Sequence, residues 1–150
     1  MYSYDDLEVG QKQELSKTLT EADIDAFAEA SGDRNPIHLD RESAQTQGFE
    51  DRIAHGMLLA SWISAMLANR LPGPGTAYLK QSLEFRKPAL PGDRLTVSLT
   101  VLEKRRRGRV RVDVAPRGDA RPAQHGPDVR AAGDGRRRLD QRVPLRQHRR

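Results

Sequence analysis

Residues 56–68 read GMLLASWISAMLA, the longest uncharged and mostly apolar stretch in this chain of 150 residues. The apolar side chains of residues 54–70 cover nearly every side of a helix, and a helix of that kind is expected inside a protein core. The stretch is shorter than the roughly 18 apolar residues that suggest a membrane span. It ends at the turn sequence Pro72-Gly73-Pro74-Gly75. The sequence therefore predicts a buried helix at the centre of the fold.

After this helix the apolar period changes from 3.6 residues to 2. Apolar and polar residues alternate over residues 77–86, 95–101 and 110–114, and turn sequences separate these runs. Alternation of this kind predicts strands that bury one face. Three successive strands joined by turns suggest an antiparallel meander.

The residues before the helix indicate a strand followed by shorter helices. Residues 13–19 are a possible first strand. Thr20 is a candidate N-cap with Asp23 in a capping-box position, and residues 21–31 carry an amphipathic pattern that ends at Gly32. Residues 33–38 are expected to be a loop because Pro36 disfavours helical backbone at the residue before it. Asp40 could cap a short helical turn through Ala44.

Together these elements predict an α+β fold, with the long apolar helix packed on one face of an antiparallel sheet.

The charge is unevenly distributed along the chain. Residues 1–103 hold 10 Lys and Arg against 16 Asp and Glu, a net charge of −6, whereas residues 104–150 carry +11. Apolar periodicity stops after residue 115, and Arg, Pro, Gly and Ala dominate the rest. Such a segment buries too little apolar surface to offset its ordering entropy. We expect one folded domain over residues 1–115 and a basic, disordered tail over residues 116–150.

Composition excludes several functional classes. The absence of cysteine excludes disulfide scaffolds, Cys-ligated metal sites and thiol catalysis. The acidic N-terminus has neither the basic nor the apolar region of a secretory signal, so a cytoplasmic, soluble protein without a membrane partner is expected. Residues 104–150 contain no Phe, Trp or Tyr. Any nucleic-acid binding by the tail would therefore be nonspecific and salt-sensitive, and no specific nucleic-acid partner is expected.

The loop Asp33-Arg34-Asn35-Pro36-Ile37-His38 is the first candidate site. It places a carboxylate and an imidazole five residues apart, and such a pair can hold one water and move its protons. The alternative is structural, with Asp33 capping backbone and His38 filling space.

The start of the apolar helix is the second candidate, because helix N-termini present free N–H groups. Gly56 would let a ligand carbonyl approach that backbone as in an oxyanion hole, although it could merely permit close packing. Ser64 could reach a polar site or bond to the carbonyl one turn earlier. His55 has no second histidine at a metal-binding spacing on this helix, so no metal site is expected.

Several motifs in order resemble the MaoC-like (R)-specific enoyl-CoA hydratases from about Tyr4 to Val114. They are Asp33-x-Asn35-Pro36-x-His38, His55-Gly56-Met57-Leu58, Leu71-Pro72-Gly73-Pro74-Gly75, Tyr78-Leu79-x-Gln81-Ser82-Leu83-x-Phe85, and Gly92-Asp93 before a strand. The resemblance implies the hotdog fold, an antiparallel sheet wrapped around a long central helix. It also implies a homodimer in which strands pair across the subunits.

The resemblance further implies reversible hydration of trans-2-enoyl-CoA to (R)-3-hydroxyacyl-CoA. Asp33 and His38 would activate the water, with either as the formal base, and the Gly56 amide would bind the thioester oxygen. Ser64 would support the polar site and Asn35 would hold the loop. The acyl-CoA is the substrate, and no metal or other cofactor is needed. The alternatives are a hotdog acyl-CoA thioesterase and a non-catalytic acyl-CoA-binding module.

The resemblance fails at the tail. Family members continue from the strand at residues 110–114 into a last apolar strand, whereas this chain continues with Pro116-Arg117-Gly118-Asp119 and Arg-rich sequence. The C-terminal strand is therefore expected to be missing or replaced. The composition is typical of a GC-rich gene translated out of frame, so residues 116–150 are a possible frameshift product; a selected basic tail is the alternative.

Overall fold

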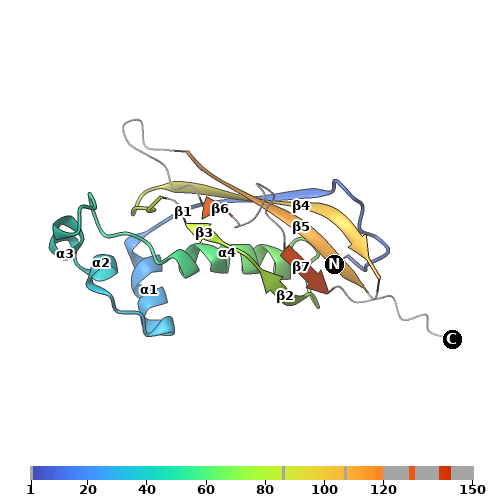
Figure 1. Cartoon of the computed structure of the whole chain (residues 1–150), viewed down its shortest axis with the longest axis horizontal. Helices are drawn as coiled ribbons and strands as arrows, with labels where there is room; N and C mark the ends of the chain where they lie inside the picture. Colours follow the sequence, from blue (N-terminus) through green and yellow to red (C-terminus); the bar gives the residue numbers. More distant parts are fainter. Residues whose placement is uncertain (1, 86, 107, 120–128, 131–138, 143–150) are drawn as a thin grey trace.

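The computed structural model describes residues 2–85, 87–106, 108–119, 129–130 and 139–142. Its main feature is one antiparallel sheet with a long helix on one face (Figure 1). The strand order in this sheet is β1-β4-β5-β7-β2, and β3 and β6 form a separate pair. The strands are β1 (Lys12–Thr18), β2 (Ala77–Gln81), β3 (Glu84–Phe85), β4 (Arg94–Arg105), β5 (Arg109–Asp119), β6 (Val129–Arg130) and β7 (Leu139–Arg142).

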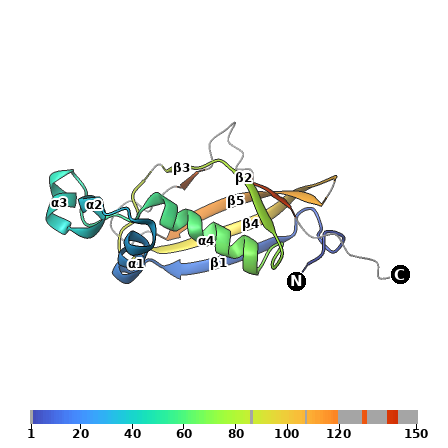
Figure 2. The same cartoon turned by 90° about the horizontal axis from the view of Figure 1, so that it is seen from below.

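Four helices accompany these strands. They are α1 (Glu21–Ser31), α2 (Pro36–Leu39), α3 (Arg41–Thr46) and α4 (Gly56–Asn69). Figure 2 shows α4 lying along the face of the sheet, with α1, α2 and α3 gathered near its N-terminal end. None of the described helices is long and apolar enough to cross a membrane.

Local sequence signals explain where α1 begins and ends. The Thr20 side chain accepts the N–H of Asp23 at 3.1 Å, and the Asp23 carboxylate accepts the N–H of Thr20 at 3.0 Å. This capping box satisfies two backbone donors that the helix cannot satisfy itself. Gly32 ends the helix with a φ of 76°, a left-handed conformation that glycine adopts without steric cost. The predicted helix over residues 21–31 is confirmed at both ends.

The core lies between α4 and the sheet. Half of the α4 side chains are buried, and they join side chains of β4 in one apolar cluster. Full burial of one such aliphatic side chain stabilises a fold by about 1.5–3 kcal/mol. The α4 members of the cluster are Leu58, Leu59, Trp62, Ile63, Met66 and Leu67, and the β4 members are Leu95, Val97, Leu99 and Val101.

Two local predictions need correction. Residues 36–39 form the short helix α2, where a loop was expected up to His38. The reason is that Pro36 occupies the first helical position, where its missing N–H costs nothing, and Asn35 caps the helix. The run over residues 77–86 is divided into β2 and β3, which lie in different sheets.

The predicted meander is also wrong in its topology. Strands β4 and β5 are adjacent, but β2 lies at the far edge of the sheet, separated from β5 by β7. The neighbour of β4 on its other side is β1, with Leu15 opposite Val97. Alternation along a strand indicates which face is buried but not which strand is its neighbour, so sequence order was a poor guide here.

The structure differs from the predicted disordered tail in the parts of residues 116–150 that it describes. Strand β5 continues to Asp119, and β7 pairs with β5 on one side and β2 on the other. The hydrogen bonds between paired strands are made by backbone groups, which do not depend on side-chain type. A segment with few apolar residues can therefore still pair as a strand. The other tail residues lie outside the described part of the chain, and their origin in a shifted reading frame stays a prediction.

Candidate active site

The candidate site lies where α4 begins. A cavity of about 320 Å³ opens there between the end of α2, the segment before α4 and the chain that follows β3. Its walls are mostly apolar, and His38 lies in the wall together with Gly56, the first residue of α4. The lining residues are His38, Phe49, Ile53, Ala54, Gly56, Leu59, Phe85, Lys87, Pro88 and Ala89.

Hydrogen bonds fix the backbone around Asp33. Its N–H donates to Ser31 Oγ at 3.1 Å, and its carboxylate accepts the N–H of Asn35 at 3.2 Å. The Asn35 side chain in turn accepts the N–H of Ile37 at 3.3 Å. Asn35 therefore forms hydrogen bonds within the loop, and it is not among the cavity-lining residues. The Asp33 side chain remains exposed.

His38 is buried, with 8% of its surface exposed. Its Nδ1 lies 2.7 Å from the backbone oxygen of Ile53. Because a carbonyl oxygen only accepts hydrogen bonds, Nδ1 carries the proton, and Nε2 of the neutral ring keeps a lone pair. Burial lowers the pKa of His38 and the nearby His55 adds to that effect, whereas the Ile53 hydrogen bond and Asp33 oppose it.

Asp33 and His38 lie close together in the structure. One carboxylate oxygen of Asp33 and ring nitrogens of His38 and His55 all lie within 4.8 Å of one another. Two hydrogen bonds of about 2.8 Å through one water span such a separation. The pair can therefore hold a water between an acceptor carboxylate and an imidazole with a free lone pair.

His55 is a third member of this cluster that sequence reasoning did not place there. Its ring stacks on His38 with centroids 3.8 Å apart, and its Nε2 lies 2.9 Å from the backbone oxygen of Asp33. The one sequence signal for His55 is its position directly before Gly56. Its contact with Asp33 joins residues 22 positions apart and follows only from the fold.

Gly56 lies at the cavity wall, directly beneath the ring of Phe85. A Cβ added to Gly56 would lie 2.8 Å from Phe85 Cε2, which is closer than real Cβ contacts. As the first residue of α4, Gly56 has an N–H for which the helix supplies no carbonyl partner. A side chain at this position could not fit beneath Phe85 unless the ring moved.

Ser64 lies apart from the other predicted site residues. It is exposed on α4, eight residues beyond Gly56, and is not among the residues that line the cavity. Eight residues correspond to about 12 Å along a helix axis. The role predicted for Ser64 in substrate binding therefore stays a prediction that the cavity of this single chain does not support.

The Asp33, His38 and His55 cluster also raises the question of a metal ion. Each imidazole already uses one nitrogen in a hydrogen bond to a backbone oxygen. The two rings are tilted by 31°, and each keeps one ring nitrogen outside these hydrogen bonds. Zinc requires nitrogen ligands at about 2.0–2.1 Å in a tetrahedral arrangement. The cluster offers two imidazole nitrogens and one carboxylate oxygen, which are donor types that zinc accepts.

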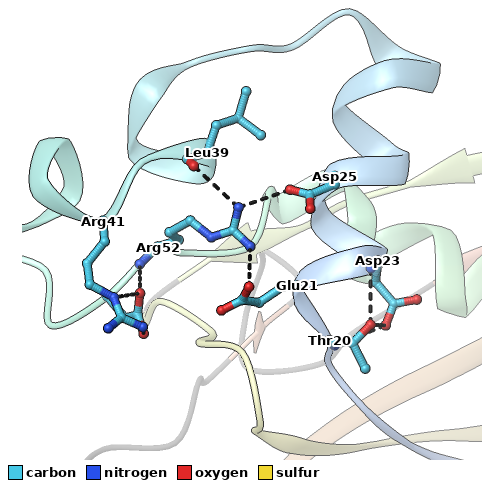
Figure 3. Close-up of polar contacts among 8 residues, drawn as sticks. Thr20, Glu21, Asp23, Asp25, Leu39, Arg41 and Arg52 are labelled. Atoms are coloured by element: carbon cyan, nitrogen blue, oxygen red, sulfur yellow. Dashed lines mark hydrogen bonds and ion pairs between the residues drawn. The ribbon is translucent and has the colours of Figure 1, made fainter.

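Arg52 was missed by the sequence reasoning and connects the elements around the site (Figure 3). Its guanidinium donates to Asp25 at 3.0 Å and to the backbone oxygen of Leu39 at 3.3 Å, and it pairs with Glu21 at 3.2 Å. These contacts join α1 and the end of α2 to the segment before α4. That segment includes Ile53, whose backbone oxygen holds His38.

The chain is similar in sequence to known hydratases and dehydratases. An (R)-specific enoyl-CoA hydratase from Rhodospirillum rubrum is 48% identical over 101 residues, which cover 67% of this chain and 70% of that protein. A 3-hydroxybutyryl-CoA dehydratase from Methylorubrum extorquens is 47% identical over 110 residues, covering 71% of this chain and 70% of the relative.

Among solved structures, the R-hydratase PhaJ1 from Pseudomonas aeruginosa superposes with a TM-score of 0.83 at 43% identity, covering 96% of this chain and 86% of that one. The (R)-hydratase from A. caviae gives a TM-score of 0.79 at 37% identity, covering 92% of this chain and 98% of that one. These likenesses confirm the predicted α+β class and hotdog fold. The MaoC-like domain model matches residues 6–118, more than half of the sequence. The chain therefore belongs to the MaoC-like domain family.

Proposed function

We propose that this protein is an (R)-specific enoyl-CoA hydratase, a lyase that adds water reversibly to trans-2-enoyl-CoA. The relatives at 47% and 48% identity carry hydratase and dehydratase names. The observation that carries the proposal is the pairing of Asp33 with His38 beside the cavity and near the N-terminus of α4.

In this proposal His38 and Asp33 hold the attacking water. The Nδ1–H of His38 is committed to the backbone oxygen of Ile53, so the lone pair on Nε2 is available to a water proton. The Asp33 carboxylate accepts a second hydrogen bond from the same water and orients its oxygen. Positioning the water in this way turns its attack on C3 into an effectively unimolecular step.

The Gly56 N–H provides the complementary electrostatic contact. As the water oxygen bonds to C3, negative charge moves to the thioester oxygen, and an N–H at a helix N-terminus stabilises that charge. The proton taken from the water by the Asp33–His38 pair returns to C2, which balances the addition. The addition forms one C–O bond and one C–H bond and needs no electron donor or acceptor, so we propose that no metal or organic cofactor takes part.

We further propose that the protein is a cytoplasmic homodimer joined through the edge of β2. The main sheet has two edges, β1 and β2. The β1 edge is rich in charged residues, which discourages pairing, whereas β2 leaves Tyr78 and Leu79 exposed by 37% and 47%. A second copy that pairs along β2 would bond to the side of β2 that has no partner strand among the described residues, and it would cover these side chains.

Hydration of crotonyl-CoA by the purified chain tests the proposed activity. We expect loss of the enoyl-thioester absorbance and formation of (R)-3-hydroxybutyryl-CoA, unchanged by EDTA. Release of free CoA thiol without hydration would identify a thioesterase instead. Binding without any conversion would identify a non-catalytic acyl-CoA-binding module.

A further inference from the structure

We propose that His55 is a positioning residue for the hydration reaction, holding Asp33 through a hydrogen bond and His38 through ring stacking. This inference rests on the proposed function. It assigns His55 no contact with substrate, because His55 does not line the cavity whereas His38 does.

The surroundings of His55 give it little freedom. Only 2% of its surface is exposed. Its ring contacts His38 at a centroid distance of 3.8 Å and Phe27 at 5.1 Å. A buried polar side chain costs free energy unless it forms hydrogen bonds. The polar contacts of the His55 ring therefore determine how it is held.

Those contacts define one tautomer of His55. Its Nε2 lies 2.9 Å from the backbone oxygen of Asp33, and because that oxygen can only accept, Nε2 carries the proton. The other nitrogen, Nδ1, is buried without a hydrogen-bond partner among the described residues. A second proton on Nδ1 would find no acceptor there. Through Nε2 the ring therefore donates to the backbone oxygen of Asp33.

His38 has the opposite tautomer, with its proton on Nδ1 and directed at Ile53. The two stacked rings thus face different partners: His55 anchors the backbone of Asp33, and His38 keeps Nε2 free for the water. In this way one buried side chain fixes the relative positions of both groups that hold the water.

Two substitutions separate the hydrogen bond from the stacking. His55→Phe keeps an aromatic ring and removes the donor, whereas His55→Gln removes the ring and places an amide N–H at the same distance along the side chain as Nε2. Phe27→Leu is a matched control because it removes the ring contact between Phe27 and His55. It leaves the hydrogen bonds from His55 to Asp33 and from His38 to Ile53 in place. Thermal unfolding and oligomeric state are measured for each variant.

We expect His55→Phe to lower kcat for crotonyl-CoA hydration by about 10²-fold, with KM within about threefold, because small displacements of catalytic groups have effects of this size. We expect kcat of His55→Gln to be at least about tenfold higher than kcat of His55→Phe, and kcat of Phe27→Leu to stay near that of the wild type. Wild-type kcat in His55→Phe, or equal losses in His55→Phe and His55→Gln, would overturn the inference.

Nitrogen-15 NMR of the imidazoles provides a readout that does not require activity. In the wild-type protein we expect a protonated Nε2 on His55 and a protonated Nδ1 on His38. A proton on Nδ1 of His55 would overturn the inference even in an active enzyme. Conversely, a wild-type protein with the expected tautomers but no hydratase activity would refute the proposed function while leaving the anchoring of Asp33 by His55 in place.

Discussion

The ring of Phe85 lies over the α-carbon of Gly56, so close that a Cβ at Gly56 would come within 2.8 Å of the ring. Phe85 belongs to β3, and Gly56 is the first residue of α4. Both residues line the cavity. The contact makes the absence of a side chain at position 56 a requirement for the present cavity shape.

Gly56→Ala is therefore expected to impair hydration more than folding. Phe85 is 44% exposed, so its ring can move outward, and overpacking of this kind costs about 1–3 kcal/mol. The displaced ring and the new methyl group would narrow the space beside the Gly56 N–H. We expect kcat/KM to fall at least about tenfold, because the thioester oxygen could no longer approach correctly.

The double variant Gly56→Ala/Phe85→Ala tests the cause of that loss. Removing the ring relieves the contact, so the double variant should be more active than Gly56→Ala alone. Losses that simply multiply in the double variant would show that the two positions act independently, contrary to this account.

Arg52 is expected to contribute more to stability than Arg41. The Arg52 side chain is 12% exposed and joins Glu21, Asp25 and the backbone oxygen of Leu39. Arg52→Ala leaves that carbonyl without this donor and should cost about 1–3 kcal/mol of unfolding free energy, measured by urea denaturation. Activity should fall as well, because the adjacent Ile53 holds His38.

Arg41→Ala is the matched control. Arg41 donates to both carboxylate oxygens of Asp51, but its side chain is 62% exposed. Exposed ion pairs contribute little, so the urea midpoint should barely move. A greater loss of stability in Arg41→Ala than in Arg52→Ala would contradict the role given to Arg52.

The lowered pKa of His38 predicts how activity and stability depend on pH. Burial favours the neutral ring, which is also the form that accepts a proton from water. The acid limb of kcat/KM should therefore lie below the ordinary histidine value of about 6.5. The stability contribution of neutral His38 is complete above that value and is lost as the pH falls through the lower pKa of the folded protein.

His38→Gln should remove the contribution of His38 to the acid limb of kcat/KM and to the pH dependence of stability. Urea denaturation of wild type and variant across this pH range should show the wild type losing relative stability toward acid. A difference in stability that does not change with pH, or an acid limb above about 6.5, would contradict the assignment of the neutral ring to the active form.

The proposed dimer predicts that a charge on the β2 edge dissociates the subunits. Leu79→Arg places a cation where two copies would face each other, so light scattering should report the mass of a monomer. Thr18→Arg on the β1 edge is the control and should leave the dimer intact. A wild-type monomer, or equal behaviour of the two variants, would exclude β2 as the interface.

Local signals in the sequence predicted local structure well. Thr20 and Asp23 are three residues apart, so their capping box is visible in the sequence and fixed the start of α1. The apolar residues of α4 likewise indicated a buried helix. Asp33 and His38 could be paired because the chain between them is short and Pro36 restricts it.

Local sequence patterns could not predict the contacts between segments that are far apart in the chain. The bonds from His38 to Ile53, from His55 to Asp33 and from Arg52 to Asp25 join residues 15, 22 and 27 positions apart. The place of β7 between β5 and β2 depends on backbone pairing, which side-chain alternation does not encode. Pro36 was interpreted as excluding a helix, although the first helical position accepts proline.

The most direct test of the central claim is the rate of crotonyl-CoA hydration by Asp33→Asn. Asparagine keeps an oxygen that can accept the N–H of Asn35, so the loop should retain its fold, while the charge on the water-binding group is lost. The control Glu42→Gln removes an exposed carboxylate of α3 outside the cavity. We predict that Asp33→Asn is slower by at least about 10²-fold with unchanged thermal unfolding, and that Glu42→Gln stays near wild type. Equal rates for Asp33→Asn and Glu42→Gln would contradict the assignment of Asp33 and His38 as the groups that activate water.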